Sequence, residues 1–399
     1  MATSNPTTTW GPSVDPGSVS NLPTVSGAHW TDLTPLSLLA SQNFPHSTSP
    51  MLSLNNADPD EPSELFMDYE ETSRVRTVLD CGVIPALSLL GVAGNCLCLA
   101  VFLRQRYHSV AKPLLLALCA SDALFLLCAL LLSLPCIVKA VDAESGRALR
   151  VSTTPQVAVL RDVMSRVTAL MTLAVGVERS VAVTRPFKLR ALCTVPRTRS
   201  AVLAIFLLVL VLQAPAFFLY DVRPHSAGNA TRPEVYRTSF YHDNEHALDV
   251  YFDYVLLAAL RGLPVVCTSV CFGVVLVSLK RRLQCACPRT PKFGAFARAK
   301  GTGQRREAET ENGDLVLEER KLTRALLAVI LLRVVSELAG LVTQLIHVIG
   351  PDIQSSSFLV ARDVSSLLSV LTSAINFILF MRFYKHFYVT FRKLLCTCN

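Results

Sequence analysis

The residues in this chain that could do chemistry are charged side chains placed within or at the ends of apolar stretches. Glu178 and Arg179 end one such stretch, and Asp122 lies inside another. A charge in hydrocarbon is costly unless it pairs or lines water, so such residues indicate ion-pair switches or binding sites. The sequence has no HExxH, no Gly-x-Ser-x-Gly and no metal-spaced cluster of histidine and cysteine. We therefore expect binding and switching, and no enzyme activity.

Seven apolar stretches must position these charges. The sequence is 51% hydrophobic and 17% charged, which is more apolar than a soluble domain of this size tolerates. Each stretch could cross about 30 Å of hydrocarbon as a helix. Because backbone groups in lipid must be satisfied within the segment, we expect an all-α membrane protein whose seven-helix bundle occupies residues 79–381. The predicted spans are about 82–103, 113–138, 156–183, 201–220, 252–279, 322–349 and 357–381.

The distribution of Lys and Arg predicts the orientation of the bundle. Residues 1–73 contain neither, whereas the connections after the first, third and fifth spans are basic. The positive-inside rule then places the N-terminus outside the cell and the tail, 382–399, in the cytoplasm of a multi-pass plasma-membrane protein. Residues 1–78 read as a disordered acidic outer tail, and about 280–320 as a long third cytoplasmic loop. The net charge of +8 follows from this topology, so no nucleic-acid partner is expected.

Modification sites agree with that orientation. Asn229 begins an Asn-Ala-Thr sequon in a connection predicted to lie outside, which makes it a glycosylation candidate. Cys81 and Cys136 lie near the outer face, where a bridge between them is an alternative to two free thiols. Cys396 and Cys398 follow an amphipathic run that suits a helix in the inner membrane interface, and acylation would anchor them to membrane lipid; unmodified thiols are the alternative.

Several motifs together resemble those of rhodopsin-like (class A) G-protein-coupled receptors. The resemblance rests on these segments: Gly94-Asn95, Leu118-Cys119-Ala120-Ser121-Asp122, Glu178-Arg179, Arg185-Pro186-Phe187-Lys188, Leu192-Cys193-Thr194 and Ser373-Ala374-Ile375-Asn376-Phe377-Ile378-Leu379-Phe380. Within the family, the chain looks most like invertebrate neuropeptide receptors typified by FMRFamide receptors. The resemblance implies a heterotrimeric G protein and an extracellular peptide as partners.

The resemblance also assigns roles to individual residues. It implies that Arg179 pairs with Glu178 and with Glu319 when inactive, and turns toward the G protein when active. It places Asn376 and Phe380 in the switch motif of the seventh helix. It implies an allosteric sodium ion as the one cofactor, and a plain hydrogen-bonded polar core is the alternative. The residues implied around the ion are Asn95, Asp122, Thr168, Ser373 and Asn376.

Departures from the family pattern leave the activation mechanism open. Ser180 and Phe380 replace family tyrosines, and the sixth span lacks the family's tryptophan and proline switch. Neither the start of the third span nor the second outer loop has a cysteine for the family's disulfide. A divergent receptor that is non-signalling or constitutively active is therefore one alternative. A seven-helix transporter or channel is another, although the sequence shows no internal repeat.

Charges at other depths in the spans predict a ligand pocket. Its candidate residues are Arg161, Asp162, Arg261, Glu337, Arg362 and Asp363. Arg333 and Glu337 are one helical turn apart and could satisfy each other. Arg166 could instead reach Glu337, and a purely structural ion-pair network is the alternative to a pocket. The resemblance implies a short, often amidated peptide as the ligand, whereas Arg161 and Arg362 argue for an anionic lipid or carboxylate.

Overall fold

The computed structural model describes residues 69–105, 111–185, 193–227, 230–285, 303–349 and 356–396 of the 399-residue chain. Most of the predicted outer tail lies outside the described residues, as does Asn229 of the sequon, whereas the end of that tail, Tyr69–Val78, is helical.

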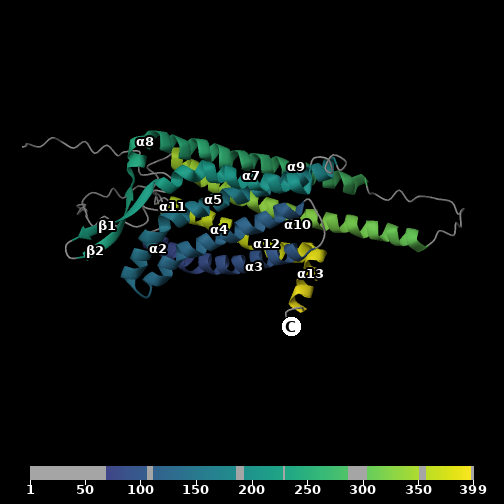
Figure 1. Ribbon diagram of the computed structural model, residues 1–399, viewed down its shortest axis with the longest axis horizontal. Coiled ribbons are helices and arrows are strands. Elements are labelled where there is room, and N and C mark those ends of the chain that lie inside the picture. Colours follow the sequence, from purple (N-terminus) through teal and green to yellow (C-terminus); the bar gives the residue numbers. More distant parts are fainter. Residues whose placement is uncertain are drawn as a thin grey trace, which may run out of the picture. The chain divides into compact units, whose positions relative to one another are not determined.

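Within the described residues, six helical segments are long and apolar enough to cross a membrane, and a bent pair of helices makes a seventh. The six are Ser73–Arg104, Ala111–Lys139, Ala143–Thr184, Val195–Phe218, Ser239–Arg281 and Lys321–Ile349. In the bent pair, Phe358–Ala374 meets Asn376–Phe383 at 40°. The predicted seven-helix bundle is confirmed, and its helices run side by side (Figure 1).

The elements follow one another along the chain with short interruptions. The first four spans comprise α2 (Tyr69–Val78), the π-helical turn η2 (Leu79–Val83), α3 (Ile84–Arg104), α4 (Ala111–Lys139), α5 (Ala143–Thr184), α7 (Val195–Gln213) and the 3-10 turn η3 (Ala214–Phe218). The remainder comprises β1 (Tyr220–Ala227), β2 (Ala230–Arg237), α8 (Ser239–Val250), the π-helical turns η4 (Tyr251–Leu256) and η5 (Ala258–Gly262), α9 (Leu263–Cys285), α10 (Gly303–Ile349), α11 (Ser356–Ala374), α12 (Asn376–Phe383) and α13 (Lys385–Cys396).

Several helices extend beyond the predicted apolar limits. α5 begins at Ala143 because the carboxylate of Asp142 accepts the N–H groups of Glu144 and Ser145, a capping arrangement that starts helices regardless of hydropathy. Hydrogen bonds from Ser145 and Glu144 lower the pKa of Asp142. α8 begins in the same way, with Thr238 as its cap. α10 begins at Gly303, inside the segment predicted to be the third cytoplasmic loop.

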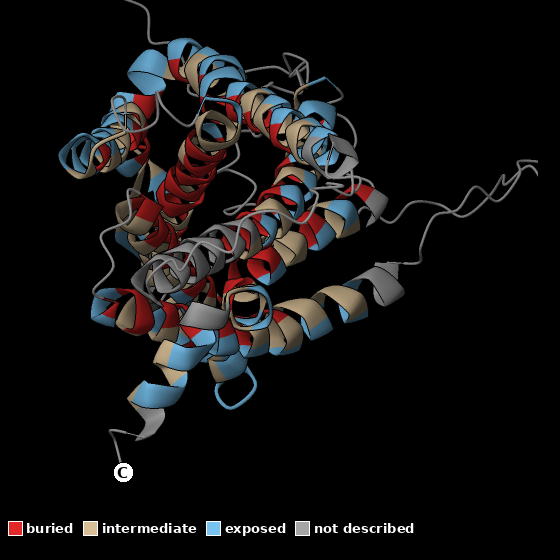
Figure 2. Ribbon diagram, turned by 90° about the vertical axis from the view of Figure 1, so that its right-hand side faces the viewer, coloured by how far each residue is buried: buried red, intermediate tan, exposed pale blue. Residues whose placement is uncertain are grey.

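Burial shows which faces of the helices form the core. Buried residues gather on the inward faces of the bundle and exposed residues on the outer faces (Figure 2). α7 is the least buried of the described spans, with only Thr198, Val209 and Gln213 buried. α3 and α11 approach closely, since a Cβ at Gly91 would come within 2.7 Å of the Cβ of Ala374. Small residues allow such close approach in membranes, where packing holds helices together.

A disulfide and an aromatic cluster fasten opposite ends of the bundle. Cys81 and Cys136 are joined, with their Cα atoms 5.5 Å apart, so η2 is tied to the end of α4. At the other end, Phe380 of α12 packs edge-on against Phe102 of α3 at 5.3 Å between ring centroids, and both contact Phe387 of α13. Phe380 and Phe387 are fully buried, so α13 is held to the bundle by aromatic packing.

The hairpin β1–β2 was not predicted. It joins the fourth and fifth spans as an antiparallel pair in which Pro224 lies opposite Pro233. At its base, the hydroxyl of Thr238 donates to the carbonyl of Phe218 at 2.6 Å. The guanidinium of Arg237 lies 4.5 Å from the ring centroid of the buried Tyr241, which fastens β2 to α8.

Candidate functional site

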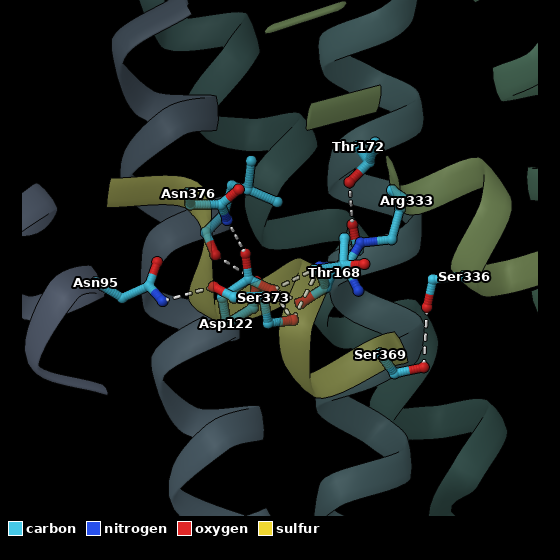
Figure 3. Close-up of polar contacts among 12 residues, drawn as sticks. Asn95, Asp122, Thr168, Thr172, Arg333, Ser336, Ser369, Ser373 and Asn376 are labelled. Atoms are coloured by element: carbon cyan, nitrogen blue, oxygen red, sulfur yellow. Dashed lines mark hydrogen bonds and ion pairs between the residues drawn. The ribbon is translucent and has the colours of Figure 1, made fainter. Parts of the chain in front are cut away.

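The first polar site lies in the middle of the bundle around Asp122, whose side chain is completely buried on α4. Its Oδ1 accepts hydrogen bonds from Nη2 of Arg333 at 2.8 Å and from the Ser373 hydroxyl at 2.9 Å. Its Oδ2 accepts one from the Asn376 amide at 2.5 Å. Figure 3 shows these side chains converging on the carboxylate. Donors from α10, α11 and α12 thus meet one acid of α4.

Neighbouring polar side chains extend this site to α3 and α5. Asn95 of α3 donates to the carbonyl oxygen of Ser373 at 2.9 Å, and the Thr168 hydroxyl of α5 donates to the Ser121 hydroxyl at 2.9 Å. We call the following set the Asp122 cluster: Asn95, Asp122, Thr168, Arg333, Ser373 and Asn376. Among the described residues, Asn95 Oδ1, Asn376 Oδ1 and Arg333 Nε have no hydrogen-bond partner.

Arg333 corrects one expectation from the sequence. We expected it to satisfy Glu337 one turn away on the same helix, but its guanidinium pairs with Asp122 of α4. Glu337 pairs instead with Arg261 of α9, at 3.6 Å between Oε2 and Nε. If Arg333 and Glu337 had paired with each other, Asp122 would have been left as a buried acid without a counter-charge. Unpaired charges cost far more in hydrocarbon than paired ones.

The Asp122 cluster does not fit the sodium ion that the resemblance implied. Arg333 already supplies one positive charge to the carboxylate, and arginine stays protonated in proteins. Ser373 both donates to Asp122 and accepts from Arg333 at 3.0 Å. Asn376 turns its amide N–H toward the acid, where an ion would need an oxygen ligand. A sodium ion at this carboxylate would meet the guanidinium as a like charge.

The second polar site is a cavity of about 290 Å³ between the ends of the helices farthest from Arg179. The charged residues among those that line it are Asp80, Arg150, Arg161, Asp162, Arg166, Arg261, Arg362 and Asp363. Five arginines face three aspartates, so the formal charge of the lining is positive. Its apolar lining includes Phe125, Phe252 and Phe358. Polar groups set into apolar walls are typical of ligand sites.

Most charges of the cavity are paired. Asp162 accepts from Arg166 on the same helix, at 3.3 Å, and from the Gln213 amide of α7 at 2.7 Å. The expectation that Arg166 could reach Glu337 is therefore wrong, because the nearer acid takes it. Asp363 of α11 accepts from Arg76 of α2 at 2.8 Å and from Arg362 at 3.2 Å.

Two predicted pocket residues hold the wall of the cavity together. Arg261 lines the cavity and donates to the carbonyl oxygen of Gly340 at 2.8 Å and to Gln344 at 3.2 Å, both on α10. Glu337 was predicted to line the pocket, but it does not belong to the cavity lining and only 5% of it is exposed. Its pairing with Arg261 makes it a support for the wall.

Arg161 differs from the other arginines of the cavity. It lines the cavity from α5, yet among the described residues its guanidinium has neither a hydrogen bond nor an ion pair. Its neighbour Asp162 is already occupied by Arg166 and Gln213. A guanidinium presents a rigid fork of donors that matches a carboxylate, so Arg161 can receive an anionic group from outside the chain.

The third polar site lies at the opposite end of α5. Arg179 donates to both carboxylate oxygens of Glu178, at 2.5 and 2.9 Å, and both residues are buried. Ser180, in the place of the family's tyrosine, donates to the carbonyl of Cys271 on α9 at 3.2 Å. Glu319 lies in α10, but its side chain is outside the described residues. Cys396 ends α13 without a described side chain, and Cys398 lies beyond the described residues.

Sequence reasoning missed several residues of the cavity. Asp80 and Arg150 line it from the ends of the first and third spans, and Gln344 lines it from the sixth. Gln213, the partner of Asp162, is a lone polar residue in the apolar run VLVLQAP, and that isolation was a usable signal. Asp80 and Arg76 lay just outside the predicted limit of the first span, where charges appear ordinary.

A family model described as 7 transmembrane receptor (rhodopsin family) matches residues 94–380, well over half of the chain. The matched range contains the Asp122 cluster and Arg179, and all of the cavity lining except Asp80 and Ile84. No curated protein matches the chain.

Proposed function

We propose that this chain, which belongs to the rhodopsin family of seven-transmembrane receptors, is a G-protein-coupled receptor that transmits binding of an extracellular ligand to a cytoplasmic G protein. The observation that carries the proposal concerns α5. Arg161 lines the cavity from the middle of this helix, and Arg179 lies near its C-terminal end, eighteen residues away, or about 27 Å along the axis. One rigid element thus connects a ligand-sized cavity with a buried charge pair.

The orientation in the membrane is part of the proposal. The basic connections at the Arg179 end support a cytoplasmic location for that end, which leaves the cavity, the disulfide and the hairpin on the extracellular side. The buried Glu178–Arg179 pair would then be the inactive arrangement. Release of Arg179 from Glu178 would expose a cation at the surface where a G protein docks.

The charge of the cavity supports a ligand with an anionic group. Arg161 has no partner among the described residues, and the lining carries an excess of arginine over aspartate. A cavity of about 290 Å³ is at the small end of ligand sites, so it suits one end of a short peptide or a small carboxylate. We favour a short peptide that places a carboxylate against Arg161.

A second ligand class is favoured by the sequence. The likeness to neuropeptide receptors suggests an amidated peptide, whose cationic group could meet an aspartate of the cavity. Asp363 and Asp162 both line the cavity, but each already accepts from two donors, which leaves Asp80 as the aspartate of the lining that such a group could meet. The amidated peptide is therefore the second candidate, and the two classes differ at the terminal group.

The test is a matched panel of ligands on cells that express the full chain with a promiscuous G protein and a calcium readout. Each peptide is offered as free acid and as amide, beside a series of fatty acids. We expect a dose-dependent response to the free acids that R161Q weakens and R179A abolishes, with surface expression of both variants equal to that of the wild type. Silence from a protein shown at the surface would contradict the signalling function.

One alternative within the family has structural support. Phe380 stands in the place of a switch tyrosine of the family and lacks its hydroxyl, and its ring packs in an aromatic cluster with Phe102 and Phe387. A receptor altered in this way could signal without ligand or not at all. Ligand-free signal that R179A abolishes would favour the constitutive reading over the ligand-dependent one.

A further inference from the structure

We infer that the guanidinium of Arg333, which is part of α10, takes the place of a bound cation in the Asp122 cluster, and that this protein is therefore insensitive to sodium. The inference goes beyond the proposed function, because it concerns what balances a buried acid and not what ligand is sensed. It rests on the contacts of the guanidinium with Asp122 and Ser373.

The contacts fill the place that a cation would take. Nη2 of Arg333 lies 2.8 Å from Asp122 Oδ1 and 3.0 Å from Ser373 Oγ, so one nitrogen contacts two of the oxygens that could bind an ion. The side chains of Asp122 and Arg333 are 0% and 4% exposed. At this burial, water screens a second positive charge poorly, and its repulsion from the guanidinium is strong.

A cation that is part of the chain differs from a diffusible ion in what determines whether it stays beside the acid. A bound ion leaves when its concentration outside falls, whereas a guanidinium does not deprotonate in proteins and cannot dissociate from the chain. Arg333 can leave Asp122 only if its side chain swings away or α10 moves relative to α4. The charge balance of the buried acid therefore depends on the position of one helix and not on the salt outside.

The experiment measures the thermal unfolding of the purified full chain in lipid nanodiscs while sodium replaces N-methyl-glucamine at constant ionic strength. We expect no sodium-dependent shift in the wild-type Tm. In R333M, which removes the charge and keeps an apolar side chain of similar length, we expect sodium to raise Tm by on the order of a few degrees. That rise should vanish in D122N/R333M, which removes the acid as well.

A matched control separates this effect from the general loss of an intramembrane arginine. R261M removes a buried arginine that pairs with Glu337, and we expect its Tm to be independent of sodium. A sodium-dependent Tm in the wild type would overturn the inference, as would a folded R333M without a sodium response. Should R333M fail to fold, R333Q, whose amide can still donate to Asp122, makes the same comparison, and the wild-type titration remains decisive.

Discussion

The Asp122 cluster and the cavity use the same residue types in one bundle, but they balance charge in different ways. In the cluster, one acid meets one guanidinium, and both oxygens of the acid accept hydrogen bonds. In the cavity, five arginines face three aspartates, and Arg161 has no partner among the described residues. The difference shows how to tell a structural ion pair from a binding site: the first is closed and neutral, and the second keeps a charged donor unused.

The largest predicted effect is the loss of stability when Arg333 is removed from the Asp122 cluster. R333M leaves Asp122 as a buried acid without a counter-charge, and breaking such a pair costs about 3–5 kcal/mol of unfolding free energy. R161M removes an arginine without a partner, so we expect a change of less than about 1 kcal/mol. Unfolding of both variants in detergent by denaturant or heat checks the contrast. Equal losses of unfolding free energy in the two variants would contradict the distinction between the Asp122 cluster and the cavity.

Removal of both charges sharpens the same test. D122N/R333M replaces an ion pair by neutral groups, so we expect it to recover part of the stability lost in R333M. A double variant that is less stable than R333M would mean that Asp122 contributes through its other hydrogen bonds more than through Arg333.

Removal of the disulfide has the next largest expected effect, and the disulfide lies beside the cavity. Cys81 and Cys136 enclose a loop of 55 residues, and loss of such a bridge costs about 2–4 kcal/mol. Cys136 and Asp80 both line the cavity, so C81S/C136S should also lower ligand potency. The sodium response should stay absent, because the Asp122 cluster lies elsewhere. Measured potency equal to that of the wild type would show that the bridge does not shape the cavity.

A smaller effect is expected on ligand potency when Arg161 of the cavity is replaced. With the agonist that the ligand panel identifies, R161Q should raise the half-maximal concentration roughly 10- to 100-fold, the loss of about 1–3 kcal/mol for a charged hydrogen bond. R161K keeps the charge without the planar fork and should fall between. Unchanged potency in R161Q, at equal surface expression, would remove Arg161 from the ligand site.

The smallest expected effect concerns the rim of the cavity. Arg76 pairs with Asp363 and is about a quarter exposed, while Arg362 also donates to that acid. Because Asp363 keeps one partner, R76Q should cost less than about 1 kcal/mol in unfolding experiments. A loss as large as that of R333M would place Arg76 in a closed pair and blur the distinction between the two sites.

Hydropathy and charge predicted most of the fold. Seven apolar stretches gave the seven spans, and the family resemblance is confirmed by the match over residues 94–380; the neuropeptide branch stays a prediction. The limits of the helices were less predictable. α5 begins at a polar segment after Asp142 because the carboxylate of Asp142 caps it where no apolar window exists. α10 begins inside the segment predicted to be a loop.

The sites could be predicted as sets of residues but not as pairs. The resemblance brought Asn95, Asp122 and Ser373 together, and the cost of charges in lipid predicted that Arg161 and Asp162 line a pocket. Which arginine meets which acid depends on helix rotation, which a single sequence does not fix. Arg333 therefore appeared to belong to Glu337, its neighbour along the helix, when its partner lay across the bundle.

The hairpin between the fourth and fifth spans has a consequence for contact between copies of the chain. An isolated pair of strands offers two outer edges, each a template for a further strand. Pro224 and Pro233 lie opposite each other, and proline is tolerated in strands where its missing N–H faces away from the partner. Both outer edges thus lose a donor at the same level. In a membrane, where copies are held in one plane, this gap disfavours edge-to-edge association.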